Sequence, residues 1–352
     1  MEGMGIMGKV LITGSEGYIG SVLMPILIEE GYEVTGLDIC FYSEGNLTNE
    51  NLPQYELLRK DIRDVTSEDL NGYDAVVHLA GLSNDPLGKL DENLTYQINY
   101  YATVELAKNA KAAGVKRFIF SSSCSLYGAN DKVLTEEDEA NPQTAYGKSK
   151  ILAEKEIGKY ADENFSPVYL RNATAFGISP RMRFDIVVNS LTGFAKTEKV
   201  IKILGDGTPW RPLVHVKDIC KAIIYSLKTP KEIIHNQAFN IGSSKENYQI
   251  KTIAEKIKEE YPECEIEIMQ KDAGDTRNYM VSFEKAEKRM KFKSGYSLNM
   301  GVKEIAAAYE KCDLTKAKFE DKLYTRLKQI ESLLNEGKLT PDLRWVELKV
   351  TA

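Results

Sequence analysis

Short apolar runs alternate with longer amphipathic stretches in the first half of the chain, and this pattern predicts alternating strands and helices. The runs expected to be strands are 10–12, 33–37, 55–58, 75–80, 118–120 and 167–171, and the first and fourth of them are expected to be buried. Helical patterns lie between them, and the longest, from Asn93 to Gly114, keeps apolar residues on one face and ends at a glycine. Strands that alternate with helices predict a doubly wound α/β fold, and the sixth strand is expected to complete its parallel sheet.

The first strand leads into a glycine loop within the stretch KVLITGSEGYIG, which covers residues 9–20 and precedes a helical pattern. Its glycines at 14, 17 and 20 lack a Cβ, which suits a tight turn, a pyrophosphate close to the main chain, and close packing of helix on strand. The phosphates would lie at the helix N-terminus, where unpaired N–H groups and the helix dipole favour anions. Alone, the same spacing also suits an ordinary turn rich in small residues.

The second strand ends at Asp38, eighteen residues after Gly20. An acid at this position is expected to bind the adenosine ribose hydroxyls of a dinucleotide. The four residues after Asp38 include no Arg or Lys. A 2′-phosphate would meet a carboxylate without a cation to offset it, so we predict NAD rather than NADP as the cofactor.

A tyrosine and a lysine, Tyr146 and Lys150, begin a helix that follows the serine-rich segment 121–128. Four residues apart, they share one helix face, so the ammonium group can lie beside the phenol. Its charge is expected to lower the pKa of Tyr146 from about 10 toward neutral, as a general base requires. Alone, this spacing is common on solvated helix faces, but the glycine loop and Asp38 make the combination specific.

Composition and charge argue against several other classes of protein. With 352 residues and 43% hydrophobic content, the chain can bury a large core, and its net charge of −6 argues against nucleic-acid and anionic-membrane partners. The apolar runs are far shorter than the ~20 residues of a membrane span, and the start, MEGMGIMG, lacks signal-peptide features. Five scattered cysteines and three histidines, without CxxC or HExxH, predict a cytoplasmic protein without a metal site.

With its GxxGxxG loop, Asp38, serine-rich strand end and YGKSK motif, the chain resembles the short-chain dehydrogenase/reductase superfamily over about residues 9–310. The similarity is to the extended branch of nucleotide-sugar epimerases and dehydratases. It implies a Rossmann-type parallel sheet with a smaller C-terminal substrate lobe, and ligands at the carboxyl ends of the strands.

Three segments are expected on this basis. Residues 1–171, with segments that return to them later, would form the NAD-binding domain, and residues 172–312 would mainly form the substrate-binding lobe. Residues 313–352 extend beyond the family core. A helical stripe of apolar residues there, Phe319, Leu323, Leu327, Ile330 and Leu334, predicts a helical extension that packs on the body or on a partner subunit. We assign this extension no chemistry.

The resemblance also implies roles for individual residues. Ser123, Tyr146 and Lys150 match the serine that hydrogen-bonds the reacting hydroxyl, the catalytic base, and the lysine that holds the nicotinamide ribose. The expected cofactor-binding residues are Gly14, Gly17, Tyr18, Ile19, Gly20, Asp38, Asp61, Ile62, Ala80, Gly81 and Lys150. The expected substrate-binding residues are Asn172, Asn189, Arg181, Arg183, Arg211 and Arg277.

Two of these assignments have simpler alternatives. Asp61 could be a turn or helix cap instead of an adenine contact. Each arginine, taken singly, could form a surface ion pair. Together the arginines suit a diphosphate, because guanidinium groups match phosphate oxygens bidentately.

These assignments predict an NAD-dependent enzyme that oxidises a hydroxyl of a nucleotide-diphosphate sugar. The hydroxyl at C4 is the one that we expect to react. Return of the hydride to the other face would make it an epimerase, and release of the keto product a dehydrogenase or dehydratase. A non-catalytic dinucleotide-binding sensor or scaffold would usually have lost the tyrosine or the lysine. A reductase of small carbonyl compounds would have no need of the arginines.

Family members commonly dimerise through the helices that match 93–114 and 146–165, so a homodimer is expected. The nucleotide base, the sugar and the carbon attacked remain open. In the family's 4,6-dehydratases an Asp-Glu pair follows the hydroxyl-binding threonine, whereas Cys124 and Ser125 occupy those positions here. Neither can protonate a leaving hydroxide at neutral pH, so we expect no dehydration unless another carboxylate, such as Asp85, supplies the acid.

Overall fold

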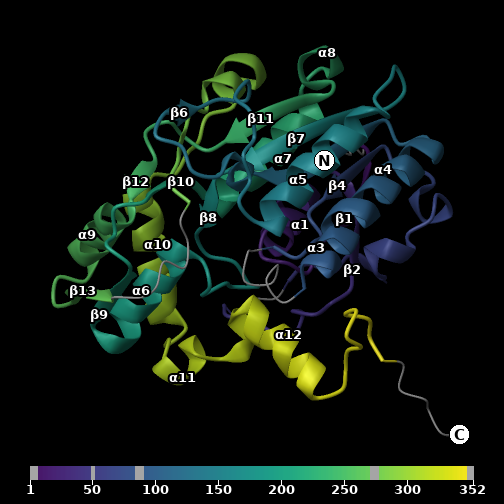
Figure 1. Cartoon of the computed structure of the whole chain (residues 1–352). Coiled ribbons are helices and arrows are strands. Elements are labelled where there is room, and N and C mark those ends of the chain that lie inside the picture. Colours follow the sequence, from purple (N-terminus) through teal and green to yellow (C-terminus); the bar gives the residue numbers. More distant parts are fainter. Residues whose placement is uncertain (1–6, 49–51, 84–90, 270–276, 347–352) are drawn as a thin grey trace, which may run out of the picture.

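The computed structural model describes residues 7–48, 52–83, 91–269 and 277–346 of the chain, which is drawn in Figure 1. Its centre is a seven-stranded sheet in the order β11-β7-β5-β4-β1-β2-β3, and every neighbouring pair is parallel. The strands are β1 (Lys9–Thr13), β2 (Glu33–Asp38), β3 (Glu56–Arg59), β4 (Ala75–His78), β5 (Arg117–Ser123), β7 (Ser166–Asn172) and β11 (Gln237–Ile241). This arrangement confirms the predicted doubly wound α/β fold.

The prediction that the sixth strand completes the sheet is wrong, because β11 adds a seventh from the second half of the chain. It pairs with β7 from Gln237 opposite Val168 to Ile241 opposite Asn172. Phe239 and Ile241 are fully buried in the core. The segment is only five residues long, QAFNI, and an apolar run this short does not stand out from the irregular sequence around it.

Helices cover both faces of the sheet. Successive side chains of a strand point to opposite faces, so they pack into two different core clusters. Val10 and Ile12 pack into the cluster that contains α1 (Gly20–Glu29) and α7 (Val216–Lys228). Leu11, between them, packs into the cluster that contains α4 (Ala102–Ala112) and α5 (Ala145–Gly158). The helix predicted from Asn93 to Gly114 is divided into α3 (Glu92–Tyr96), a π-helical turn (Gln97–Tyr101) and α4.

A smaller lobe lies beside the carboxyl ends of the strands (Figure 1). It contains the sheet β12-β10-β8 and the parallel pair β9 and β13, with β6 and β14 forming another short pair. The strands are β6 (Val133–Leu134), β8 (Thr174–Phe176), β9 (Val200–Leu204), β10 (Trp210–His215), β12 (Asn247–Gln249), β13 (Glu265–Met269) and β14 (Met280–Val281). The helices of the second half are α6 (Val187–Glu198), α8 (Lys231–Ile234), α9 (Ile250–Glu260) and α10 (Leu298–Lys311).

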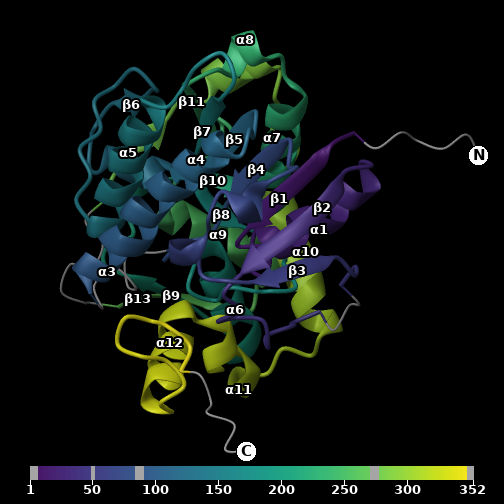
Figure 2. The ribbon, with the colours of Figure 1, turned by 90° about the vertical axis from the view of Figure 1, so that its right-hand side faces the viewer.

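The C-terminal extension packs on the body of its own chain. It contains α11 (Lys316–Phe319) and α12 (Arg326–Asn335), and it ends in an antiparallel bridge between Leu339 and Trp345. Figures 1 and 2 show it in yellow, running from beneath α6 to beneath the central sheet. Phe319 packs against Phe184, with ring centres 5.0 Å apart. Ile330 belongs to the core cluster that also contains residues of α4 and α5. Within the described residues, no helix is both long and apolar enough for a membrane span.

Candidate active site

A cavity of about 1210 Å³ lies between the carboxyl ends of the central strands and the smaller lobe. Residues at or just after the ends of β1, β2, β4, β5 and β7 line its sheet side: Gly14, Asp38, Ala80, Ser123 and Asn172. The topology of a doubly wound sheet places these strand ends together, although they are distant in the sequence. The position of the cavity agrees with the expected ligand site.

The glycine loop forms the tight turn that the sequence predicts. Gly14 has a φ of +78°, and a Cβ added there would lie 2.7 Å from the backbone nitrogen of Ala80. A Cβ on Gly20 would collide with the carbonyl oxygen of Gly14. The residue before α1, Ile19, makes no side-chain cap. The loop therefore suits the close approach of a diphosphate to the first N–H groups of α1.

Two carboxylates, Asp38 and Asp61, line the end of the cavity beside β2 and β3. Asp38 accepts hydrogen bonds from the backbone N–H of Glu16 (3.0 Å) and of Cys40 (2.6 Å), and burial raises its pKa to about 6. Asp61 accepts a hydrogen bond from the Arg63 backbone N–H at 2.8 Å and pairs with its guanidinium group at 2.6 Å. Asp61 is thus a turn cap, as in the simpler alternative, and it also lines the cavity.

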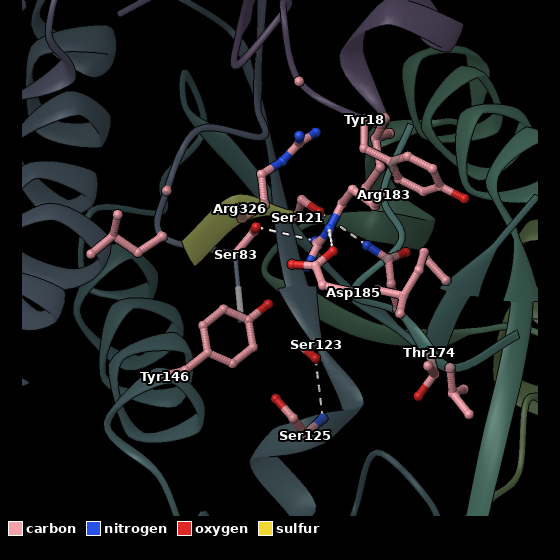
Figure 3. A pocket seen from close by; sticks show the side chains of 18 of the residues that line it. Tyr18, Ser83, Ser121, Ser123, Ser125, Tyr146, Thr174, Arg183, Asp185 and Arg326 are labelled. Atoms are coloured by element: carbon pink, nitrogen blue, oxygen red, sulfur yellow. Dashed lines mark hydrogen bonds and ion pairs between the residues drawn. The ribbon is translucent and has the colours of Figure 1, made fainter. Parts of the chain in front are cut away.

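Ser123, Tyr146 and Lys150 meet on one wall of the cavity. The Lys150 ammonium group lies 5.7 Å from the centre of the Tyr146 ring and donates a hydrogen bond to the carbonyl oxygen of Ser121 at 2.8 Å. Lys150 is only 6% exposed, and burial lowers its pKa to about 8. Figure 3 shows the Tyr146 and Ser123 side chains facing the same part of the cavity.

The two residues after Ser123 have different positions. The Cys124 thiol is fully buried and donates a hydrogen bond to the carbonyl oxygen of Arg171 at 3.0 Å, away from the cavity. Ser125 lines the cavity, and its Oγ has no hydrogen-bond partner among the described residues. The Oδ1 of Asn172 likewise lines the cavity without a partner there. Buried polar atoms are normally paired, so these two oxygens suit contact with a bound ligand.

Three of the four predicted arginines line the cavity, namely Arg183, Arg211 and Arg277. Arg183 pairs with Asp185 through Nε (2.8 Å) and Nη2 (3.1 Å) and donates from Nη1 to the Ser83 hydroxyl (3.1 Å), as Figure 3 shows. Arg211 donates to the carbonyl oxygens of Trp210 (2.8 Å) and of Arg277. These contacts hold the guanidinium groups of Arg183 and Arg211 in place on the cavity wall.

Two predicted substrate residues, Arg181 and Asn189, do not reach the cavity. Arg181 is buried, pairs with Glu16 and donates to the carbonyl oxygen of Gly45 at 2.7 Å. Asn189 is fully buried and accepts a hydrogen bond from the Gly177 N–H at 3.1 Å. Both residues hold together the segments around the cavity instead of facing it, and this cannot be read from their positions in the loop before α6 and in its first turn.

Other residues of the cavity were not expected from the sequence. Arg326, the first residue of α12, lines the cavity with its guanidinium carbon 4.2 Å from the centre of the Tyr42 ring. The only signal for it is a basic residue beside an apolar helical stripe, a combination that most surface helices share. Asp85, the alternative acid, lies outside the described residues. Over the described ranges, no cluster of His, Cys, Asp and Glu could hold a metal ion.

Comparison with known proteins places this geometry among known enzymes. Residues 10–242 match the model of the NAD dependent epimerase/dehydratase family. A UDP-glucose 4-epimerase from Corynebacterium glutamicum is 31% identical over 303 residues, covering 80% of this chain and 89% of that protein. The structure of the UDP-glucose 4-epimerase from Thermotoga maritima with UDP-glucose is 26% identical, with a TM-score of 0.76 over 86% of this chain and 99% of that one. A complex of MoeE5 with UDP-glucuronic acid and NAD is 25% identical, with a TM-score of 0.76 and the same coverage.

Proposed function

Because this chain belongs to the NAD-dependent epimerase/dehydratase family, we propose that it is an NAD-dependent nucleotide-sugar 4-epimerase and that a UDP-hexose is its substrate. The observation that carries the proposal is the continuity of one cavity. The glycine loop, the Ser123–Tyr146–Lys150 group and the arginines all line it. A dinucleotide on the loop and a diphosphate on the arginines would therefore meet beside Tyr146.

The proposed reaction begins with oxidation at C4 of the sugar. NAD held by the glycine loop and Asp38 would supply the hydride acceptor for this oxidation and the hydride donor for the reverse step. Tyr146 takes the proton of the C4 hydroxyl while Ser123 holds that hydroxyl by a hydrogen bond. The Lys150 ammonium group, fixed by the Ser121 carbonyl, stabilises the phenolate form of Tyr146. When the 4-keto sugar presents its other face, Tyr146 gives the proton back and the C4 configuration is inverted.

The residues after Ser123 support epimerisation over dehydration. Elimination of water across C5 and C6 needs an acid and a base beside the sugar. Cys124 lies in the core, where its thiol donates a hydrogen bond to the carbonyl oxygen of Arg171, and Ser125 offers only a hydroxyl to the cavity. Asp185, a carboxylate of the cavity, is already paired with Arg183. We therefore propose that the 4-keto sugar is reduced again without losing water.

The proposal includes a cytoplasmic homodimer. All five cysteines are free thiols, as expected in a reducing compartment. Tyr101, at the end of the π-helical turn, is 60% exposed, and Leu152 on the neighbouring helix α5 is 38% exposed. Large apolar side chains exposed on adjacent helices favour contact with a second copy of the chain.

The test is an assay for inversion at C4. The purified protein, supplied with NAD, is incubated with UDP-glucose and UDP-galactose, and then with GDP-, dTDP- and CDP-sugars, and the products are identified by NMR and mass spectrometry. We expect each UDP-hexose to be converted into its C4 epimer of equal mass. A product lighter by one water would identify a dehydratase. Absence of turnover across the panel would leave a dinucleotide-binding sensor or scaffold.

A further inference from the structure

Arg326 carries a charge that the protein buries without a contact ion pair. It is 3% exposed, and its Nη2 donates a hydrogen bond to the carbonyl oxygen of Arg181 at 3.1 Å. The guanidinium group also lies on the face of the Tyr42 ring. Among the described residues, no carboxylate forms an ion pair with it. A buried charge of this kind is costly unless an anion accompanies it.

Other buried arginines of the chain show the contrast. Arg171 pairs with Glu154 at 2.7 Å, Arg181 pairs with Glu16, and Arg183 pairs with Asp185 at 2.8 Å. Burial, reinforced by the nearby charge of Arg183, lowers the pKa of Arg326 to about 10. The protein thus places two guanidinium groups near each other, and within the described residues only Arg183 has a carboxylate in ion-pair contact, while Asp185 and Asp38 act on Arg326 from a distance.

The position of Arg326 indicates which anion would accompany it. It lines the cavity together with Tyr42 and Asp38, which lie at and after the end of β2, and its charge acts on Asp38. Figure 3 shows it beside Arg183 and Ser83, above Asp185. Asp38 accepts a hydrogen bond from the backbone N–H of Glu16 in the glycine loop, so this part of the cavity adjoins the loop on which a dinucleotide is expected to place its diphosphate.

The extension that carries Arg326 is attached to the same part of the cavity. Gln329 donates to the carbonyl oxygen of Phe41 at 3.2 Å, and the Trp345 indole donates to that of Ile39 at 2.6 Å. Arg63 donates to the carbonyl oxygen of Asp342 at 2.8 Å. The backbone N–H of Arg326 donates a hydrogen bond to the carboxylate of Asp185, which is the ion-pair partner of Arg183. The extension therefore holds the segments after β2 and β3 and supports Arg183.

We propose that the C-terminal extension is part of the dinucleotide site and that Arg326 binds the diphosphate of the dinucleotide. The inference rests on the proposed function only for the identity of the dinucleotide, NAD. A diphosphate between Arg326 and the N-terminus of α1 would neutralise the buried guanidinium charge and accept hydrogen bonds from the guanidinium group. The extension thus contributes to ligand binding in addition to packing on the body.

The test compares ligand affinities of the whole chain, freed of bound nucleotide, with those of Arg326→Gln and Arg326→Lys. Calorimetry with ADP-ribose, adenosine and UDP separates the diphosphate of the dinucleotide from its base and from the substrate. We expect Arg326→Gln to weaken ADP-ribose binding about 10- to 100-fold, the usual effect of losing a charged hydrogen bond, and to leave adenosine and UDP unchanged. Arg326→Lys, which keeps the charge, should recover part of the loss.

The matched control is Lys328→Gln, which removes one positive charge from the exposed face of the same helix. It should leave all three affinities unchanged. Equal ADP-ribose affinity in Arg326→Gln and the wild type would overturn the inference, and so would a loss confined to UDP. A wild-type protein that binds neither NAD nor ADP-ribose would overturn the proposed function as well.

Thermal unfolding separates ligand binding from a purely structural role. In Arg326→Met, which replaces the buried charge by an apolar side chain, we expect the rise in Tm caused by NAD to shrink while the Tm of the free protein is kept. A structural role would give the opposite result, a lower Tm of the free protein with an undiminished rise on adding NAD. That outcome would overturn the inference even if Arg326→Gln cannot be purified.

Discussion

At the scale of single residues, the chemistry we propose for the cavity depends on the placement of one phenol, Tyr146, beside one buried ammonium group, Lys150. Lys150 is held by the Ser121 carbonyl and also lies 4.6 Å from the centre of the Phe120 ring. These contacts fix its position independently of any ligand. Since burial lowers its pKa only to about 8, it remains mostly charged at pH 7 and can stabilise a phenolate.

The first prediction concerns Tyr146→Phe. We expect turnover to fall by about two to four orders of magnitude, the usual contribution of a general base, because no other group in the proposed mechanism takes the proton. NAD affinity should remain near the wild-type value, since the ring and its packing are kept. Steady-state kinetics and a fluorescence titration with NAD measure the two effects. Unchanged turnover would show that Tyr146 is not the base.

The second prediction uses the pKa of Lys150. Burial lowers the pKa of Lys150 to about 8 in the folded protein, whereas its ordinary value, which applies to the unfolded chain, is 10.5. Between these two pH values Lys150 is protonated in the unfolded chain and mostly deprotonated in the folded protein. The unfolding free energy should therefore rise with pH through this window, by about 1.4 kcal/mol per pH unit for this group. Below pH 8 the penalty for burying the charge is fully present.

Lys150→Met removes this dependence while keeping an apolar side chain of similar length. Urea unfolding of both proteins from pH 7.5 to 10 should show the wild type gaining about 2 to 3 kcal/mol relative to the variant. Other lysines and tyrosines titrate in both proteins, so their effects cancel in the difference. Parallel pH profiles would contradict the burial of a charged Lys150.

At the scale of elements, the glycine loop shows why small residues are needed where strand, helix and ligand meet. A Cβ on Gly20 would press on two backbone oxygens, those of Gly14 and Ser15. A Cβ on Gly17 would meet only the Gly14 oxygen, at 3.1 Å. Backbone atoms of a tight turn cannot move as freely as the end of a side chain, so the two positions differ in tolerance.

The third prediction follows from this difference. Gly20→Ala should lower the unfolding free energy by about 1 to 3 kcal/mol, as overpacking does, and should abolish measurable NAD binding because the turn must open. Gly17→Ala should keep the fold with a smaller loss on both counts. Thermal unfolding and NAD titration of the two variants test the prediction. Equal losses of stability and of NAD affinity in the two variants would contradict the prediction, because they would show that the backbone of the turn can move to accommodate a Cβ at Gly20.

The elements that sequence reasoning found are those with a long or distinctive pattern. Strands such as β1 and β4 are continuous apolar runs, and the glycine loop combines spacing with position, so both were predictable. β11 was missed because its five residues carry no periodicity of their own. Arg181 and Asn189 were expected in the cavity from the family resemblance, but only tertiary contacts decide which side chains of the loop before α6 and of the first turn of α6 face the cavity. Arg326 comes from the tail, whose contact with the cavity depends on the whole fold.

At the scale of the whole molecule, the proposed dimer depends on the exposed apolar side chains of the π-helical turn and of α5. Tyr101 packs against Tyr100 with the rings tilted by 45° and their centres 4.7 Å apart, and it is still 60% exposed. Its helix packs on α5, which carries the exposed Leu152. Two adjacent helices in each subunit would make this face self-complementary under a two-fold axis.

The fourth prediction is that Tyr101→Glu converts the dimer into a monomer, because two carboxylates would face each other in the buried contact. Sedimentation velocity of the wild type and the variant measures the change. The matched control is Ile28→Glu on α1, where a 37% exposed apolar residue lies on another helix. It should leave the dimer intact. Dimers in the Tyr101 variant would place the contact elsewhere.

The late arrival of β11 also affects how the protein is made. During synthesis β7 emerges well before β11, and all of β8, β9 and β10 is translated between them. At ribosomal rates this interval lasts on the order of several seconds, and throughout it the outer edge of β7 has no partner strand. An open edge of a parallel sheet is a template for pairing with another chain. A nascent chain halted before β11 therefore exposes an edge that can pair with another chain until β11 is synthesised.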